Sequence, residues 1–297
     1  MQLHLLRISM FSVIIKQMQN KSKIKALKDY FQKREDVLMA FLFGSQAKKL
    51  SSKRSDWDIS VYLKPASYQV EWEQERDYPQ EDEIWGDLIK MLDTDNVDLI
   101  ILNRAPADIS ATAIAGLPLI IKDRRAYLEF MLIITKEAED YRQTVQEYSD
   151  IYWRSASLSE EDGRLLNKRI LFLSTELKEI EQFRNMNQFE YQRDSIKRKA
   201  VERWIENLMN ASIDIAKTIL ASEHKSMPSN YREILLTLAV LPGFLEDTAS
   251  QLAEWAKLRN ILAHEYLDVR WQKIQAFVAK ADSCFHDLIK SVQEFLK

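Results

Sequence analysis

The sequence contains few of the residues that build cross-links, tight turns and metal sites. Its 297 residues include one cysteine, Cys284, with only five glycines and six prolines. A single cysteine excludes an intramolecular disulfide and a cysteine-based zinc site, and it fits a reducing cytoplasm. Few glycines and prolines favour long helices with short connections over an all-β or disordered chain.

The chain also has no strong charge of one sign and no long apolar run. Its formal net charge is −3, which excludes a polycation that coats nucleic acid. The first 15 residues are mildly apolar, without a small-residue cleavage site, and far shorter than a membrane span. We expect residues 1–19 to be an N-terminal extension, or to precede a true translation start near Met18, and we expect a cytoplasmic protein without membrane contact.

The first part of the chain, residues 20–122, mixes helical and strand patterns. Apolar residues at helical spacing predict helices over 21–33, within 71–92 and over 107–116. Short apolar runs predict strands over 37–43, 58–63, 97–102 and 119–121. We therefore expect a small α+β domain with a mixed sheet.

From residue 123 to 297 the periodicity is almost entirely helical, which predicts a second, all-α domain built as a helical bundle. The domain boundary is expected at residues 122/123. The predicted helices cover 124–153, 160–184, 194–222, 229–239, 244–265 and 270–296.

Three aspartates in the first domain suit divalent-metal chemistry. Asp56 and Asp58 are two residues apart next to a predicted strand, so their side chains share a face. Asp98, at the start of the next apolar run, supplies a third carboxylate. Oxygen ligands of this kind suit Mg²⁺, and two ions can clamp the attacking and leaving oxygens of a nucleotidyl transfer. The alternative is that Asp56 and Asp58 are only turn and cap residues.

The stretch FLFGSQAKKLSSKRSDWDIS resembles the signature of the minimal nucleotidyltransferases, in which Gly-Ser precedes Asp-x-Asp by ten residues. Gly44 and Ser45 lie where a strand turns into a helix, and there free N–H groups and a hydroxyl can hold a triphosphate. The resemblance implies a polymerase-β-like fold, ATP as substrate and Asp98 as third carboxylate. Lys48-Lys49 stand where the family usually has Arg-Gly.

A second constellation lies in KLRNILAHEYLDV, near the end of a predicted helix. It contains Arg259, Asn260, His264 and Tyr266. Taken alone, an arginine five residues before a histidine decides little. The alternative interpretation is that His264 is a helix-terminal side chain and Tyr266 a packed aromatic residue.

The surroundings of that motif resemble HEPN domains, whose motif reads Arg-x4-His-x-Tyr, and in particular the toxin of HEPN–MNT toxin–antitoxin pairs. The resemblance implies a metal-independent ribonuclease formed across a homodimer, in which Arg259 holds the phosphate, His264 moves the proton and Asn260 orients the site. Five basic residues offer further RNA contacts or form an ordinary solvated face: Arg193, Lys197, Arg198, Lys199 and Arg203.

In the separate-chain relatives, the nucleotidyltransferase antitoxin adenylylates the motif tyrosine. Tyr266 is therefore the implied acceptor, and its modification, in cis or in the partner subunit, is expected to silence the ribonuclease. The first alternative is a nucleotidyltransferase for a small molecule such as an aminoglycoside, with the helical domain shaping the pocket. A second is a non-catalytic interaction module.

Overall fold

The computed structural model describes residues 20–47, 56–66, 70–154, 156–256, 258 and 267–297. The chain forms two compact units, Met1–Glu139 and Asp140–Lys297. The units divide inside helix α5, Arg124–Arg154, whereas the sequence pattern changes at residues 122/123, just before this helix begins.

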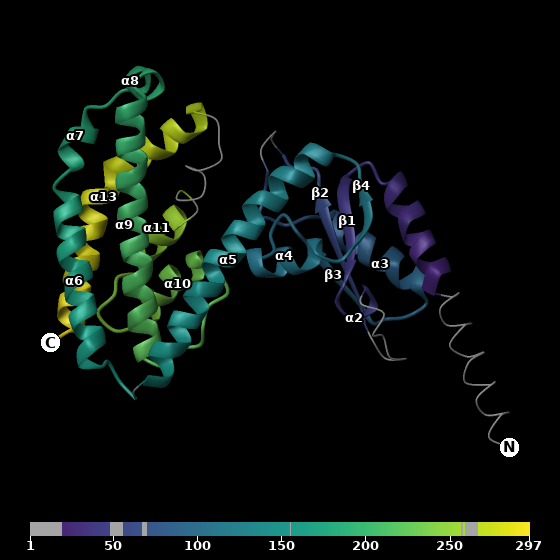
Figure 1. Cartoon of the computed structure of the whole chain (residues 1–297), viewed down its shortest axis with the longest axis horizontal. Helices are drawn as coiled ribbons and strands as arrows, with labels where there is room; N and C mark the ends of the chain where they lie inside the picture. Colours follow the sequence, from purple (N-terminus) through teal and green to yellow (C-terminus); the bar gives the residue numbers. More distant parts are fainter. Residues whose placement is uncertain (1–19, 48–55, 67–69, 155, 257, 259–266) are drawn as a thin grey trace. The chain divides into compact units, whose positions relative to one another are not determined.

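A four-stranded sheet forms the centre of the first unit, in the order β3-β2-β1-β4 (Figure 1). Its strands are β1 (Val37–Phe43), β2 (Trp57–Leu63), β3 (Val97–Ile101) and β4 (Leu117–Ile121). β1 is antiparallel to β2 and β4, and β2 is parallel to β3. β4 begins two residues before the predicted strand and includes Pro118, which an edge strand tolerates. The predicted mixed sheet is confirmed.

Helices cover both faces of this sheet, which is why its strands are almost wholly apolar. The helix of residues 20–33 and α3 (Gln80–Leu92) pack on one face, through Leu27, Phe31, Ile84 and Leu88. α4 (Ala107–Ile114) and the first part of α5 pack on the other face, through Ile114, Phe130 and Ile134. Parallel β2 and β3 need a crossover, and α3 supplies it.

The second unit consists of helices around the long helix α9, Ser195–Ser222 (Figure 1). Asp194 caps α9 by accepting the backbone N–H groups of Ile196 and Lys197. α9 packs against α6, α8, α10 and α11. The helices around it are α6 (Glu160–Leu177), α7 (Ile180–Arg184), α8 (Gln188–Arg193), α10 (Tyr231–Thr237), α11 (Glu246–Ala256) and α13 (Leu267–Phe295).

Aromatic side chains fill the centre of this helical core. The Phe277 ring of α13 lies 5.7 Å from the ring of Trp204 on α9 and 4.4 Å from the ring of Trp255 on α11. Phe285 stacks on Trp255 at 5.9 Å. Large rings joining three helices in this way give the unit one continuous core.

The stretch of residues 160–193 differs from its predicted helix. The predicted helix over 160–184 breaks after Leu177 into α6 and α7. At the break, the Trp204 indole N–H donates to the Glu176 carbonyl oxygen at 2.7 Å, so a tertiary bond occupies a carbonyl group at the helix end. α8, a further short helix, begins with a capping box between Asn187 and Glu190 that the sequence analysis did not use.

Among the helices in the described part of the chain, none combines the length and the apolar character needed to cross a bilayer.

Candidate active site and helical domain

β1 ends in a backbone turn that only glycine fits. Gly44 has φ +67°, directly after the strand and at the start of the short helix α2, Gly44–Ala47. A Cβ atom on Gly44 would lie 2.0 Å from the Asp58 Oδ2 atom. The carboxylate of Asp58 therefore lies against the Gly44 backbone.

Two of the three predicted carboxylates are neighbours across the parallel strands. Asp58 on β2 pairs with Asp98 on β3 in the register of the sheet. Trp57 and Ile59 point into the core beneath the helix of residues 20–33 and α3. Because side chains alternate along a strand, Asp58 and Asp98 lie together on the opposite face. Asp98 is exposed and Asp58 half-buried.

Asp56 is the residue before β2, and its side chain is exposed. Its negative charge still reaches the pair. Burial raises the pKa of the Asp58 carboxyl above its usual value, and the charges of Asp98 and Asp56 raise it further. Asp98 and Asp56 therefore each repel the ionised carboxylate of Asp58, and this repulsion favours a bound cation.

Carboxylate oxygens are the donors that Mg²⁺ prefers, so the residues present fit that ion chemically. The side chains are not gathered into a finished site, however. Within the residues that the structure describes, no three His, Cys, Asp or Glu side chains meet closely enough to hold a metal ion. The strand pairing places two carboxylates, those of Asp58 and Asp98, next to each other. Asp56 is exposed and lies just before β2, outside the sheet.

Trp85 and Asn96, which the sequence analysis did not single out, make hydrogen bonds to the residues directly before Asp98 and Asp58. The Trp85 indole on α3 donates to the Val97 carbonyl oxygen at 3.0 Å, directly before Asp98. The Trp57 N–H donates to the Asn96 carbonyl oxygen at 3.0 Å, directly before Asp58. The sequence signal that could have identified Trp85 is a tryptophan among the charged residues of α3. In the structure Trp85 is 45% exposed.

Family comparison finds two domains in this one chain. Residues 25–125 match the polymerase beta nucleotidyltransferase family, and residues 173–292 match the ribonuclease HepT-like family. The chain joins a nucleotidyltransferase domain to a HepT-like domain. The predicted fusion is therefore confirmed by both matches. A search among curated proteins finds no match to the chain.

In the HepT-like domain, the predicted ribonuclease residues Arg259, Asn260 and His264 and the acceptor Tyr266 lie outside the described residues. The chain on either side of them is part of the core. Leu258 is buried upstream, and Trp271 is buried downstream. The roles of the four motif residues therefore remain predictions.

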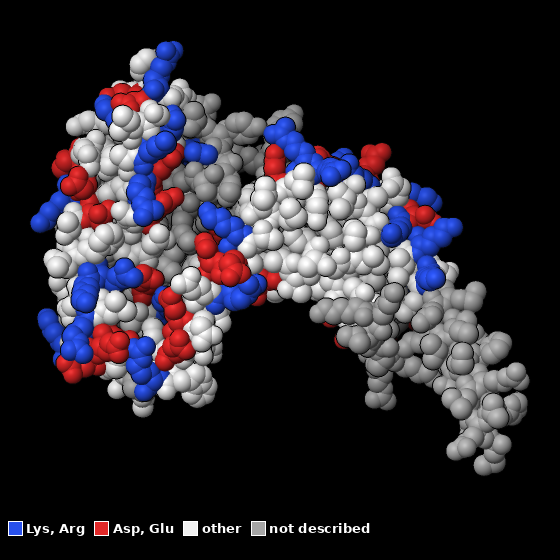
Figure 2. Space-filling view, viewed as in Figure 1, with Lys and Arg blue, Asp and Glu red and all other residues white. Residues whose placement is uncertain are grey.

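The basic residues at the end of α8 and the start of α9 make contacts within the HepT-like domain itself. Lys197 pairs with Glu190 at 2.7 Å, and Arg203 pairs with Glu206 at 3.2 Å. Arg198 donates to two carbonyl oxygens at the end of α8, and Arg193 lies over the Phe189 ring. Figure 2 shows acidic and basic side chains interspersed over the visible face of the helices. These contacts favour the reading of an ordinary solvated face.

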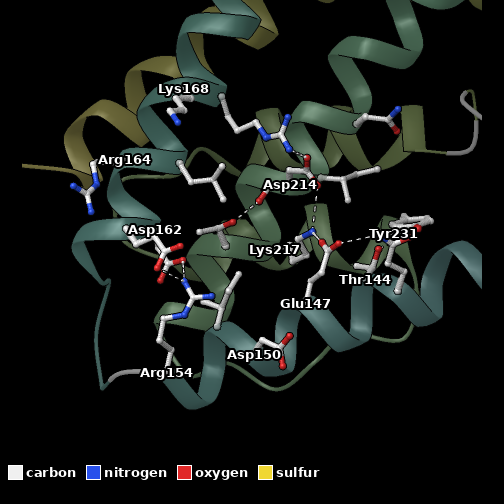
Figure 3. A pocket seen from close by; sticks show the side chains of 18 of the residues that line it. Thr144, Glu147, Asp150, Arg154, Asp162, Arg164, Lys168, Asp214, Lys217 and Tyr231 are labelled. Carbon is white, nitrogen blue, oxygen red and sulfur yellow. Dashed lines mark hydrogen bonds and ion pairs between the residues drawn. The ribbon is translucent and has the colours of Figure 1, made fainter.

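A charged cavity of about 680 Å³ lies in the second unit, lined by residues of α5, α6 and α9 and by Tyr231 of α10 (Figure 3). Buried Lys217 pairs with Glu147 and with Asp214, the latter at 3.3 Å. Arg169 also reaches Asp214, at 2.6 Å, and Arg154 pairs with Asp162 at 2.8 Å. These ion pairs cross-link the three helices and neutralise one another, so the lining favours neither an anionic nor a cationic ligand. Of the predicted site residues that the structure describes, none lines it.

Proposed function

We propose that the nucleotidyltransferase domain transfers AMP from ATP to Tyr266 and thereby silences the ribonuclease activity of the HepT-like domain. The observation that supports this most is the in-register pair Asp58–Asp98 against the Gly44 turn. An acidic pair beside a strand-to-helix turn is the arrangement that nucleotidyl transfer needs, since that chemistry depends on positioning a triphosphate and neutralising its charge.

In this proposal Asp58, Asp98 and Asp56 would hold Mg²⁺, and two ions would be bound together with ATP. The bound ions supply charge neutralisation at the triphosphate. The turn at Gly44 and Ser45 holds the phosphates through backbone N–H groups and the serine hydroxyl. Burial raises the pKa of Asp58, and the negative charges of Asp98 and Asp56, which a bound cation would offset, raise it further.

The transfer step forms one bond and breaks one. The Tyr266 phenol oxygen attacks the α-phosphorus of ATP, and the bond from that phosphorus to the bridging oxygen of the β-phosphate breaks. Pyrophosphate leaves with the electron pair of that bond. The phenol proton passes to a carboxylate of the acidic cluster and then to water.

The proposed target is a metal-independent ribonuclease, formed in a cytoplasmic homodimer. The RNA 2′-oxygen attacks the adjacent phosphorus while the 5′-oxygen of the next nucleotide leaves. His264 moves the proton, Arg259 holds the phosphate and Asn260 orients the site. An adenylyl group on Tyr266, two residues from His264, adds bulk and a negative charge that repel RNA. Joining both domains in one chain raises the effective concentration of the acceptor.

Intact-mass measurement with peptide mapping tests the proposal. Purified protein is incubated with Mg²⁺ and ATP, beside the Asp58→Asn, Asp98→Asn and Tyr266→Phe variants. We expect an AMP-sized gain on the peptide that contains Tyr266 in the unaltered protein, and none in the three variants. We also expect unmodified protein to cleave RNA and modified protein not to cleave it.

The other outcomes discriminate between the alternatives. A gain that persists in Tyr266→Phe would reject this acceptor. No gain, with ATP still bound, would reject self-modification and leave transfer to a small molecule as the function to pursue. ATP that does not bind with Mg²⁺ would leave a non-catalytic interaction module.

A further inference from the structure

The chain is held on both sides of residues 259–266, which carry the proposed ribonuclease and acceptor residues. Upstream, Trp255 on α11 packs against Phe277, and Leu258 is buried. Downstream, Arg270 and Trp271 on the first turn of α13 contact α8 and α9. The upstream contact is apolar, whereas the downstream contact is built around a charged group.

Three polar side chains from three helices meet at that downstream contact. The Tyr191 hydroxyl of α8 donates to the Glu202 Oε1 atom of α9 at 2.6 Å. The Arg270 guanidinium of α13 donates to the same oxygen at 3.3 Å. The side chains of Arg270 and Glu202 are each 15% exposed. The Tyr191 ring is fully buried and lies 5.5 Å from the Trp271 ring.

The chemistry of this triad is better suited to orienting the start of α13 than to stabilising the fold. A buried ion pair loses much hydration on folding, so it adds little net stability compared with apolar side chains of the same volume. It does constrain direction, because each donor must point at one oxygen. The Arg270 Nε atom is buried and, in the described part of the chain, has no hydrogen-bond acceptor. The Arg270 guanidinium is therefore oriented by its bond to the Glu202 Oε1 atom rather than by a bond from Nε.

Arg270 follows Tyr266 by four residues, and α13 begins at Leu267. We propose that Tyr191, Glu202 and Arg270 form a positioning triad that fixes the start of α13, and that adenylylation of Tyr266 and RNA cleavage with His264 depend on it. This inference rests on the proposed function for those two residues. None of the three triad residues contacts ATP or RNA in this role, so they are positioning residues.

Two isosteric variants and one matched control test the triad. Glu202→Gln removes the charge but keeps an acceptor, and Tyr191→Phe removes one hydroxyl but keeps the ring on Trp271. The control is Glu206→Gln, one turn further along α9, where the glutamate pairs with Arg203 at the surface at 3.2 Å. Hydrogen–deuterium exchange is followed in the peptide covering residues 259–272, together with the rate of AMP incorporation.

We expect faster exchange in that peptide for both triad variants and unchanged exchange for the control. AMP incorporation at saturating ATP should fall roughly tenfold, since small displacements of reacting groups cost large factors in rate. KM for ATP should stay the same, because ATP binds at Asp58 and Asp98 in the other domain. Unchanged exchange and rate in Tyr191→Phe would overturn the proposal, as would exchange that rises equally throughout the helices.

A double variant separates positioning from ordinary core stability. Glu202→Gln with Arg270→Met removes both charges, which should restore thermal stability lost by Glu202→Gln alone. The rate and the local exchange should not recover, because the directional contact is gone. Recovery of rate together with stability would reduce the triad to a structural role. If the unaltered protein takes no AMP on Tyr266, the proposed function fails, and the exchange measurements still decide whether the triad fixes this segment.

Discussion

Asp58 and Asp98 lie side by side on β2 and β3, in register and on the same face of the sheet. Without a cation, the ionised form of Asp58 is disfavoured in the folded protein, because burial and two neighbouring negative charges raise its pKa. Carboxylates that repel one another in this way favour a bound cation. This leads to predictions for stability as well as for activity.

Replacing Asp58 by Asn should abolish nucleotidyl transfer and yet raise the melting temperature at neutral pH. A carboxyl whose folded pKa lies above its unfolded value binds protons more tightly when folded, so its ionised form opposes folding. The stability gain from Asp58→Asn should therefore shrink as pH falls through the raised pKa. Thermal unfolding followed across that pH range measures it.

The control for Asp58→Asn is Asp95→Asn, an exposed aspartate three residues before Asp98. It should leave both transfer and melting temperature close to those of the unaltered protein. A lower melting temperature for Asp58→Asn at neutral pH would show that repulsion in the acidic cluster is not the dominant effect at this position.

Magnesium should stabilise the nucleotidyltransferase domain through the same carboxylates. A ligand that binds only the folded state raises stability as its concentration rises above the dissociation constant. We expect the melting temperature of the unaltered protein to rise with Mg²⁺, and more with Mg²⁺ and ATP together. Asp98→Asn should remove most of the shift while Asp95→Asn keeps it. An equal shift in both variants would place the ion elsewhere.

Much of the nucleotidyltransferase domain was predictable because its signals are local. Apolar runs located the strands, but Asp56, which the two-residue spacing placed on one strand with Asp58, lies just before β2. The register of β2 against β3 was not predictable in the same way. It depends on contacts between residues far apart in the sequence, such as the Trp57 N–H bonded to the Asn96 carbonyl oxygen, and no local pattern encodes them.

The helical unit shows the same limit. Its helices follow from periodicity, but the break after Leu177 coincides with a hydrogen bond from Trp204, which lies 28 residues from Glu176. The Arg270–Glu202 contact joins residues 68 positions apart. The motif from Arg259 to Tyr266 was identified by resemblance, and its geometry lies outside the described residues, so its roles depend on the experiments proposed above.

The turn at Gly44 should be intolerant of any side chain. Gly44→Ala would place a methyl group 2.0 Å from the Asp58 Oδ2 atom, in a backbone conformation with φ +67°. We expect loss of nucleotidyl transfer and a destabilisation of about 1–3 kcal/mol, the usual cost of such backbone strain. Chemical denaturation and the AMP incorporation assay measure the two effects.

Gly86 provides the matched control for Gly44. It lies inside α3, where an added Cβ atom meets nothing within 4 Å. Gly86→Ala should stabilise the protein by about 0.5–1 kcal/mol, since alanine loses less conformational entropy in a helix. It should leave transfer unchanged. Equal and normal transfer in both variants would show that the Gly44 turn does not shape the site.

The ion pairs around the charged cavity should make the helical unit sensitive to acid. Burial alone would raise the pKa of the Glu147 carboxyl, but the ammonium of Lys217 outweighs burial and lowers it. A carboxyl with a lowered folded pKa adds stability above its unfolded pKa, and that stability is lost as pH falls through the folded value. Glu147→Gln should therefore lower the melting temperature at neutral pH, and its difference from the unaltered protein should vanish in acid.

The comparison for Glu147→Gln is Asp150→Asn, one turn along α5, where the aspartate accepts a hydrogen bond from Gln146 at 3.0 Å. Among the described residues Asp150 makes no ion pair like that between Glu147 and Lys217. Its replacement should therefore change the melting temperature little at any pH. Melting curves for the three proteins across the acid range test this. A Glu147→Gln difference that stays constant as pH falls would show that Lys217 stabilises the cavity by packing rather than by charge.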